Sequence, residues 1–128
     1  MPGPKNILLV DDQQHFLVAL ANALKECSNT YSILTAENGD SALKALESGR
    51  VDLVVTDLRM PVMDGFGLIS NMKKKYPGIP VIVLSSYSCP ELKPRLKAMG
   101  VSQYIEKSSL DISALEQMIQ EIWPGPQF

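Results

Sequence analysis

Three short runs of apolar residues stand out along the chain. They cover residues 7–10, 51–55 and 81–84, are rich in branched side chains and barely alternate with polar residues. Strands that are buried on both faces of a parallel sheet show this pattern, because neither face is open to water. Two weaker strands are predicted at residues 31–36 and 102–105.

Segments with helical spacing of apolar residues follow the predicted strands. Their apolar positions, about one turn apart, are Phe16, Leu20, Leu24 and Cys27; Ala42, Leu43 and Leu46; Phe66, Ile69 and Met72; and Ile112, Leu115, Ile119 and Ile122. Asp40 is the expected N-cap of the second helix, and Gly49 and Gly100 stand where helices should end. The order of elements is therefore a strand followed by a helix, five times over.

Regular alternation of strands and helices predicts the α/β class, with a doubly wound five-stranded parallel sheet covered by helices on both faces. The expected strand order is 2-1-3-4-5, which places the first and third strands side by side. The length of 128 residues fits one domain. We expect this domain to span residues 5–123, with residues 124–128 as a tail or the start of a linker.

Composition and charge narrow the class of protein. The chain is 45% hydrophobic and 20% charged, which is typical of a globular protein, and its net charge of −2 gives no support for a nucleic-acid surface. One histidine and two cysteines argue against a zinc site and a disulfide framework. The sequence has no apolar run of membrane-spanning length. We expect a cytoplasmic protein that binds neither nucleic acid directly nor a membrane.

Acidic residues gather at the predicted ends of two neighbouring strands. Asp11 and Asp12 follow the first strand, and Asp57 closes the third. In the predicted strand order, these residues share the crevice where open α/β sheets bind ligands. Three carboxylates so close repel one another, so a hard divalent cation with oxygen ligands, Mg²⁺, is expected there.

Two further residues follow the fourth and fifth strands at the same edge. Ser85 offers a hydroxyl group and Lys107 a fixed positive charge. With the acids and a cation, they make a site for a phosphoryl group, in which Asp57 would be the nucleophile. Taken singly, each residue has a plainer interpretation: Asp11 and Asp12 as a helix cap, Asp57 as a turn residue, and Lys107 as a surface lysine. Together they favour the phosphoryl site.

Residues 57–65, which read DLRMPVMDG, resemble the phosphoacceptor segment of receiver domains of two-component response regulators. The acidic pair before this segment, and the serine and lysine after it, occur at the separations usual in that family. The resemblance extends from about Asn6 to Trp123. It implies a CheY-like, flavodoxin-like fold and a protein that is no enzyme beyond Mg²⁺-dependent self-phosphorylation and autodephosphorylation.

The resemblance also implies a role for each site residue. Asp57 is the phosphoacceptor, and Mg²⁺ or Mn²⁺ is bound by Asp12, Asp57 and the backbone carbonyl of Arg59, with Asp11 acting through water. Lys107 binds the phosphoryl group, and Ser85 and Tyr104 are the switch residues, although an aromatic side chain at Tyr104 is equally consistent with simple packing. Arg59 and Tyr87 stand where the family tunes the lifetime of the phosphoryl group.

Partners are implied in the same way. The phosphoryl donor is a sensor histidine kinase or a phosphotransfer protein, and the output is a downstream effector domain or protein. A phosphorylation-dependent dimer remains open. The alternative function is a receiver-like binding module that acts without phosphorylation. A phosphatase or phosphotransferase with an aspartate nucleophile is disfavoured, because Arg59 occupies the position where a second acid is needed.

Two features depart from the family pattern. Ser108 follows Lys107 where the family usually has a proline in a cis bond, and we predict a trans bond, since a cis bond before a non-proline residue costs about 3–4 kcal/mol. Pro90 and Pro94 fall where the fourth helix should begin. Proline is tolerated only in the first turn of a helix, so we predict a late start near residues 91–93 or a distorted helix.

Overall fold

The computed structural model describes residues 5–27, 30–86 and 89–122. Five strands form one sheet in the order β2-β1-β3-β4-β5, and each neighbouring pair is parallel. Both the strand order and the parallel arrangement predicted from the sequence are confirmed. The strands are β1 (Lys5–Val10), β2 (Tyr31–Ala36), β3 (Leu53–Thr56), β4 (Val81–Ser85) and β5 (Gln103–Glu106).

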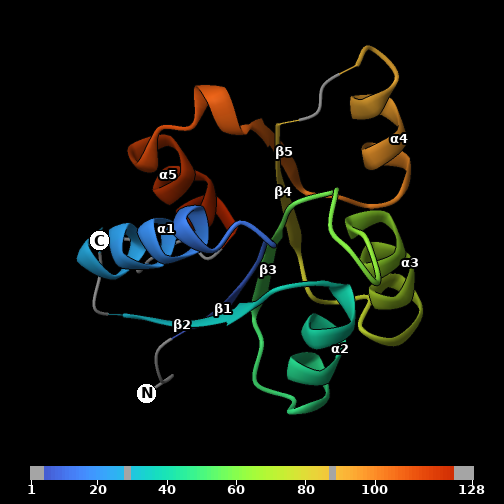
Figure 1. Ribbon diagram of the computed structural model, residues 1–128, viewed down its shortest axis with the longest axis horizontal. Helices are drawn as coiled ribbons and strands as arrows, with labels where there is room; N and C mark the ends of the chain where they lie inside the picture. Colours follow the sequence, from blue (N-terminus) through green and yellow to red (C-terminus); the bar gives the residue numbers. More distant parts are fainter. Residues whose placement is uncertain (1–4, 28–29, 87–88, 123–128) are drawn as a thin grey trace.

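Helices cover both faces of the sheet. Figure 1 shows α1 and α5 on one face and α2, α3 and α4 on the other. Each face has its own cluster of buried apolar side chains, and β1, β3 and β4 contribute alternate residues to the two clusters. The helices are α1 (Gln14–Cys27), α2 (Gly39–Glu47), α3 (Gly65–Lys75), α4 (Leu92–Ala98) and α5 (Ile112–Ile122), with a short 3-10 turn at Lys107–Ser109.

The third strand begins two residues later than the sequence predicted. Val51 is buried, but the regular strand starts at Leu53. The intervening Asp52 makes a different contact, in which its Oδ2 accepts a hydrogen bond of 2.8 Å from the backbone N–H of Asn6. The Asp52 side chain thus holds the segment before β3 against β1.

The N-cap predicted for α2 was wrong. Asn38 is the N-cap: its backbone is extended, and its side-chain oxygen accepts a hydrogen bond of 2.8 Å from Ser41 N–H. Asp40 lies in the first turn, where its negative charge still favours the positive end of the helix. The predicted helix ends are confirmed, because Gly49 and Gly100 adopt φ angles of 77° and 86°, which a residue with a side chain rarely adopts.

Helix α4 is short and begins late, as the prolines predicted. It starts at Leu92, so Pro94 is its third residue and lies in the first turn, where no backbone N–H is needed for the helix. A helix that began at Pro90 would place the ring of Pro94 against the carbonyl group of Pro90. The Lys107–Ser108 bond is trans, as predicted, and the described residues contain no cis peptide bond.

Candidate functional site

The three predicted acids meet at the carboxyl ends of β1 and β3. Asp11 and Asp57 are buried, with 3% and 5% of their surface exposed, whereas Asp12 is exposed. One carboxylate oxygen from each residue lies within 4.8 Å of the other two. Because β1 and β3 are paired in register, with Val10 opposite Thr56, residues 46 positions apart in the chain end at the same point of the sheet edge.

Backbone hydrogen bonds fix the position of Asp57. Its N–H donates to the carbonyl oxygen of Val10 at 2.9 Å, and its Oδ1 accepts from the N–H of Leu58 at 2.7 Å. The carbonyl oxygen of Leu58 in turn accepts from the N–H of Gly65 at 2.9 Å. The carboxylate therefore extends from a well-fixed backbone, and its orientation is set before any ligand binds.

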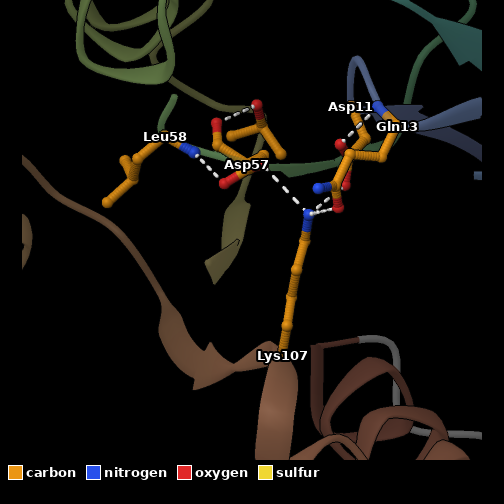
Figure 2. Close-up of polar contacts among 6 residues, drawn as sticks. Asp11, Gln13, Asp57, Leu58 and Lys107 are labelled. Atoms are coloured by element: carbon orange, nitrogen blue, oxygen red, sulfur yellow. Dashed lines mark hydrogen bonds and ion pairs between the residues drawn. The ribbon is translucent and has the colours of Figure 1, made fainter. Parts of the chain in front are cut away.

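Lys107 reaches the two buried acids from the end of β5 (Figure 2). Its Nζ lies 2.6 Å from Asp11 Oδ2 and 3.0 Å from Asp57 Oδ2, and it donates a third hydrogen bond of 3.0 Å to Gln13 Oε1. Only 9% of the lysine side chain is exposed. The predicted surface alternative for Lys107 is thus wrong, because its ammonium group is enclosed by the acids.

Burial and pairing act in opposite directions on these groups. Burial raises the pKa of Asp11, although Lys107 and the Gln13 N–H both favour its charged form. Burial alone would lower the pKa of Lys107, but the hydrogen bonds and negative charges of Asp11 and Asp57 outweigh it, and its pKa lies above the ordinary value. Lys107 therefore stays charged at neutral pH and compensates the buried carboxylates.

The loop after Asp57 has an unusual backbone at Val62. Its φ angle is 70°, and Met63 N–H donates to the carbonyl oxygen of Pro61 at 2.8 Å, which closes a γ-turn around it. A β-branched residue rarely adopts a positive φ angle. The carbonyl oxygen of Met63 accepts a hydrogen bond of 2.9 Å from Gly39 N–H, and this bond joins the turn to the start of α2. Asp64 ends the loop and caps α3, because its side chain accepts a hydrogen bond from Gly67 N–H.

The remaining predicted residues lie around this centre. Ser85 ends β4, is buried, and is paired in register with Glu106, the residue before Lys107. Arg59 has an exposed side chain. Tyr104 is half-buried, packs against the cluster on the α2–α4 face and lines surface hollows beside α4. Tyr87 lies outside the described residues.

Two residues at the site were missed by the sequence prediction. Gln13 accepts a hydrogen bond from Lys107, and the ring of Phe16 lies 4.5 Å from the lysine nitrogen. Phe16 was expected only as a core position of the first helix. The signal that could have found both residues is their position, since the start of a helix after β1 must lie at the same edge of the sheet as the acids.

The donor set fits a hard divalent cation. Carboxylate oxygens are the ligands that Mg²⁺ prefers, and three of them lie within reach of one another here. The exposed carboxylate of Asp12 leaves the site open on one side. Because Mg²⁺ usually keeps several waters, an open side agrees with this cation better than a closed protein cage would.

The comparison with known families agrees with the geometry of this site. Residues 7–120 match the response regulator receiver domain family. The chain therefore belongs to the receiver domains of two-component response regulators. The strand order, the acids at the carboxyl ends of β1 and β3, and the helices on both faces of the sheet are the features that define the class in this chain.

Individual relatives place the chain within this class. It is 38% identical over 118 residues to the transcriptional regulatory protein GlrR of Escherichia coli; the match covers 92% of this chain and 26% of GlrR. The chain thus spans about a quarter of the length of that relative. It is 33% identical to the response regulator TrrA of Thermotoga maritima, solved in complex with Mg²⁺-BeF, with a TM-score of 0.81 over 92% of this chain and 98% of that one.

A receiver domain protein from Methanospirillum hungatei, described as CheY-like, is 26% identical and has a TM-score of 0.85 over 94% of both chains. The predicted family and fold are confirmed. Among the described residues, every helix is too short or too polar to span a membrane.

Proposed function

We propose that Asp57 accepts a phosphoryl group and that this event switches the affinity of the domain for its partners. One observation carries the proposal: a buried carboxylate, Asp57, contacts a buried lysine, Lys107, at 3.0 Å, at the only edge of the sheet where all strands end. A buried pair of this kind costs desolvation energy that an apolar pair would not, so its presence favours a functional role.

The proposed chemistry uses the chain's own groups. A carboxylate oxygen of Asp57 attacks phosphorus of a phosphohistidine, the P–N bond breaks, the histidine nitrogen leaves with the bonding electrons, and an acyl phosphate forms. The Leu58 N–H holds the other side of the carboxylate in place. Lys107 turns to the oxygens of the phosphoryl group, and the hydroxyl group of Ser85 donates a hydrogen bond to them.

The proposed cofactor is Mg²⁺, for which Mn²⁺ can substitute. Asp12, Asp57 and the carbonyl oxygen of Arg59 would hold it, with Asp11 acting through water. When bound, the ion supplies positive charge that offsets the charge of the phosphoryl oxygens. TrrA, a relative of this chain, was solved with Mg²⁺-BeF, which supports the assignment by analogy.

The proposed output is a change of surface beside α4. Phosphorylation adds negative charge at the edge of the sheet, Ser85 moves toward it, and Tyr104 follows, which alters the hollows that Tyr104 lines between α4 and β5. The proposed donor is a sensor histidine kinase or phosphotransfer protein, and the proposed recipient is an effector domain or protein. A phosphorylation-dependent dimer and a cytoplasmic location stay predictions.

A receiver-like module that acts without phosphorylation is not favoured. Such a module has no need for a lysine buried between two acids, and the chain retains Asp11, Asp57 and Lys107 in mutual contact. The serine after Lys107 leaves the lysine in place, although the bond there is trans. The loss of the proline therefore gives the alternative no support.

The proposal is tested by intact-mass analysis after incubation with acetyl phosphate, with and without Mg²⁺. We expect a single phosphoryl adduct that requires Mg²⁺ and is absent from Asp57→Asn. Asp40→Asn is the matched control, because Asp40 is an exposed acid in the first turn of α2 and pairs with Lys44 through an exposed ion pair of 3.6 Å.

An adduct of equal yield in Asp57→Asn would show that another residue is the phosphoacceptor. A folded wild-type chain that binds Mg²⁺ but forms no adduct would contradict the proposal and favour the module that acts without phosphorylation.

A further inference from the structure

The ammonium group of Lys107 has a fourth neighbour besides its three oxygen acceptors. Phe16, the third residue of α1, places its ring centroid 4.5 Å from the lysine nitrogen. This distance is within the range of a cation–π interaction, which is stronger when the pair is shielded from water. With 9% of the lysine side chain exposed, this pair is shielded.

The ring complements the hydrogen bonds of Lys107 and does not compete with them. An ammonium group has three N–H donors, and here Asp11, Asp57 and Gln13 each accept one. The attraction to a ring acts on the charge of the group and needs no further donor. Phe16 is itself held in place, because it packs against the buried cluster between α1, α5 and the sheet.

The four neighbours differ in what phosphorylation does to them. Asp57 would be phosphorylated and Asp11 drawn toward the cation, so both would change charge or partner during the cycle. Gln13 is exposed, so water can replace its contact with the lysine. Phe16 is uncharged and anchored in the core, so its contact with the lysine is the one that the chemistry leaves unchanged.

We propose that Phe16 is a positioning residue for Lys107, which holds the ammonium group at the site when Asp57 exchanges its contact with the lysine for a bond to phosphorus. The inference rests on the function proposed above for Asp57. It assigns to the start of α1 an indirect part in the chemistry, because Phe16 acts through Lys107.

The first test compares rates of phosphorylation by acetyl phosphate at saturating Mg²⁺. Phe16→Leu keeps an apolar side chain but removes the ring, and we expect the rate to fall about 3- to 30-fold, the range that a cation–π contact supports. Phe16→Tyr restores the ring and should restore most of the rate. Tyr76→Leu is the matched control, because its side chain packs against the cluster on the opposite face of the sheet, at the C-terminal end of α3.

A double-mutant cycle separates positioning from a general loss of packing. In a Lys107→Met background, Phe16→Leu should cause no further change in rate, since the group that the ring holds is gone. A further loss of the same size in that background would overturn the proposal and assign Phe16 a purely structural role. Equal rates for wild type and Phe16→Leu would overturn it as well.

The ring contact is also measured without phosphorylation. By NMR, the ε-methylene protons of Lys107 should be shifted upfield by the ring current of Phe16, and the shift should vanish in Phe16→Leu. If the wild type forms no adduct, the function proposed for Asp57 fails. The NMR shift then tests the contact between Phe16 and Lys107 by itself. A missing shift would overturn the contact, and a clear shift would support it. If the adduct forms but Phe16→Leu has no effect, only the positioning role fails.

Discussion

The two sides of the site are built in different ways. On the β3 side, Asp57 and the residues after it are fixed by backbone hydrogen bonds, and Asp64 caps the eleven-residue helix α3 with a side-chain bond of 2.9 Å to Gly67 N–H. On the β4 side, the helix that follows has only seven residues, and its N-cap, Glu91, makes no side-chain hydrogen bond.

The difference matters for how the site works. A carboxylate that accepts a phosphoryl group, as we propose for Asp57, must be oriented before its ligand arrives, which requires a rigid support. A surface that reports phosphorylation must be able to move, and such segments come from the less stable parts of a fold. Helix α4 is held by two buried leucines, Leu92 and Leu96, and by the contact of Arg95 with Phe66. These few contacts can be exchanged without unfolding the sheet.

Gly65→Ala breaks the rigid side and should have the largest effect. A Cβ at this position would overlap the carbonyl oxygen of Asp57 and lie 2.8 Å from Leu58 Cα, and backbone atoms cannot yield as a flexible side chain can. We expect the free energy of unfolding to fall by more than about 3 kcal/mol, or the protein not to fold. Urea denaturation measures the loss.

Gly78→Ala is the control, since a Cβ there meets nothing within 4 Å and should change stability by less than about 0.5 kcal/mol. Equal effects of the two substitutions would show that the close contact at Gly65 is not a constraint.

Lys107→Met removes the cation that pairs with both buried acids of the site. The buried carboxylates of Asp11 and Asp57 would lose their partner, and we expect a loss of about 3 kcal/mol at pH 7 in urea denaturation without Mg²⁺. Lys97→Met, on the exposed surface of α4, is the control and should have little effect.

The loss in Lys107→Met should depend on pH in a defined direction. Burial already raises the folded pKa of Asp11 above its ordinary value of 3.8, and loss of the lysine raises it further. The folded state then binds the proton more tightly than the unfolded state, so this carboxyl group favours folding below pH 3.8 and ceases to do so as the pH rises through the folded pKa. The difference in the free energy of unfolding between the wild type and Lys107→Met should therefore become smaller as the pH falls from 7 toward 4. A difference that does not change with pH would contradict this explanation.

Asp64→Ala removes the cap that α3 has and α4 lacks. We expect a loss of about 1 kcal/mol in the free energy of unfolding, the usual cost of deleting a capping side chain. Glu91→Ala at the start of α4 is the matched variant and should cost almost nothing, because its side chain makes no capping bond. A similar loss of stability in both variants would contradict the proposal that a side-chain cap stabilises α3 and not α4.

Pro94→Ala tests what sets the start of α4 and should have the smallest effect on global stability, a few tenths of a kcal/mol, since no helical hydrogen bond is lost at this position. The new N–H at residue 94 can donate to the carbonyl group of Pro90, so the helix should lengthen toward its N-terminus. Amide hydrogen exchange at residue 94 should then be as slow as at Arg95, whose N–H donates to the carbonyl oxygen of Glu91. Fast exchange at residue 94 would show that Pro94 does not set where α4 begins.

Much of this arrangement could be predicted from the sequence. The branched apolar runs identify strands buried on both faces, and a parallel sheet necessarily brings the strand ends to one edge, so the meeting of Asp11, Asp57 and Lys107 follows from the order of elements. The late start of α4 follows from the geometry of the proline ring alone.

The details that failed depend on contacts within a few ångströms. Asn38 and Asp40 are both good capping residues, and the sequence does not show which of them meets the first free N–H groups. The contact of Phe16 with Lys107 depends on how α1 is rotated about its axis, and its apolar spacing suits either a core or a site position. The positive φ of Val62 accompanies the hydrogen bond from Gly39 N–H to the carbonyl oxygen of Met63. This bond joins residues far apart in the chain, so no local sequence pattern predicts it.

The late position of Lys107 in the chain has a consequence for synthesis. The acids lie on β1 and β3, whereas the cation that compensates them lies on β5, the last strand. During translation, a nascent chain that has made only its first three strands carries the carboxylates without the lysine, and repulsion opposes their close approach. Unless Mg²⁺ takes the place of the lysine, we therefore expect the pocket around Asp57 to close only after β5 has been synthesised.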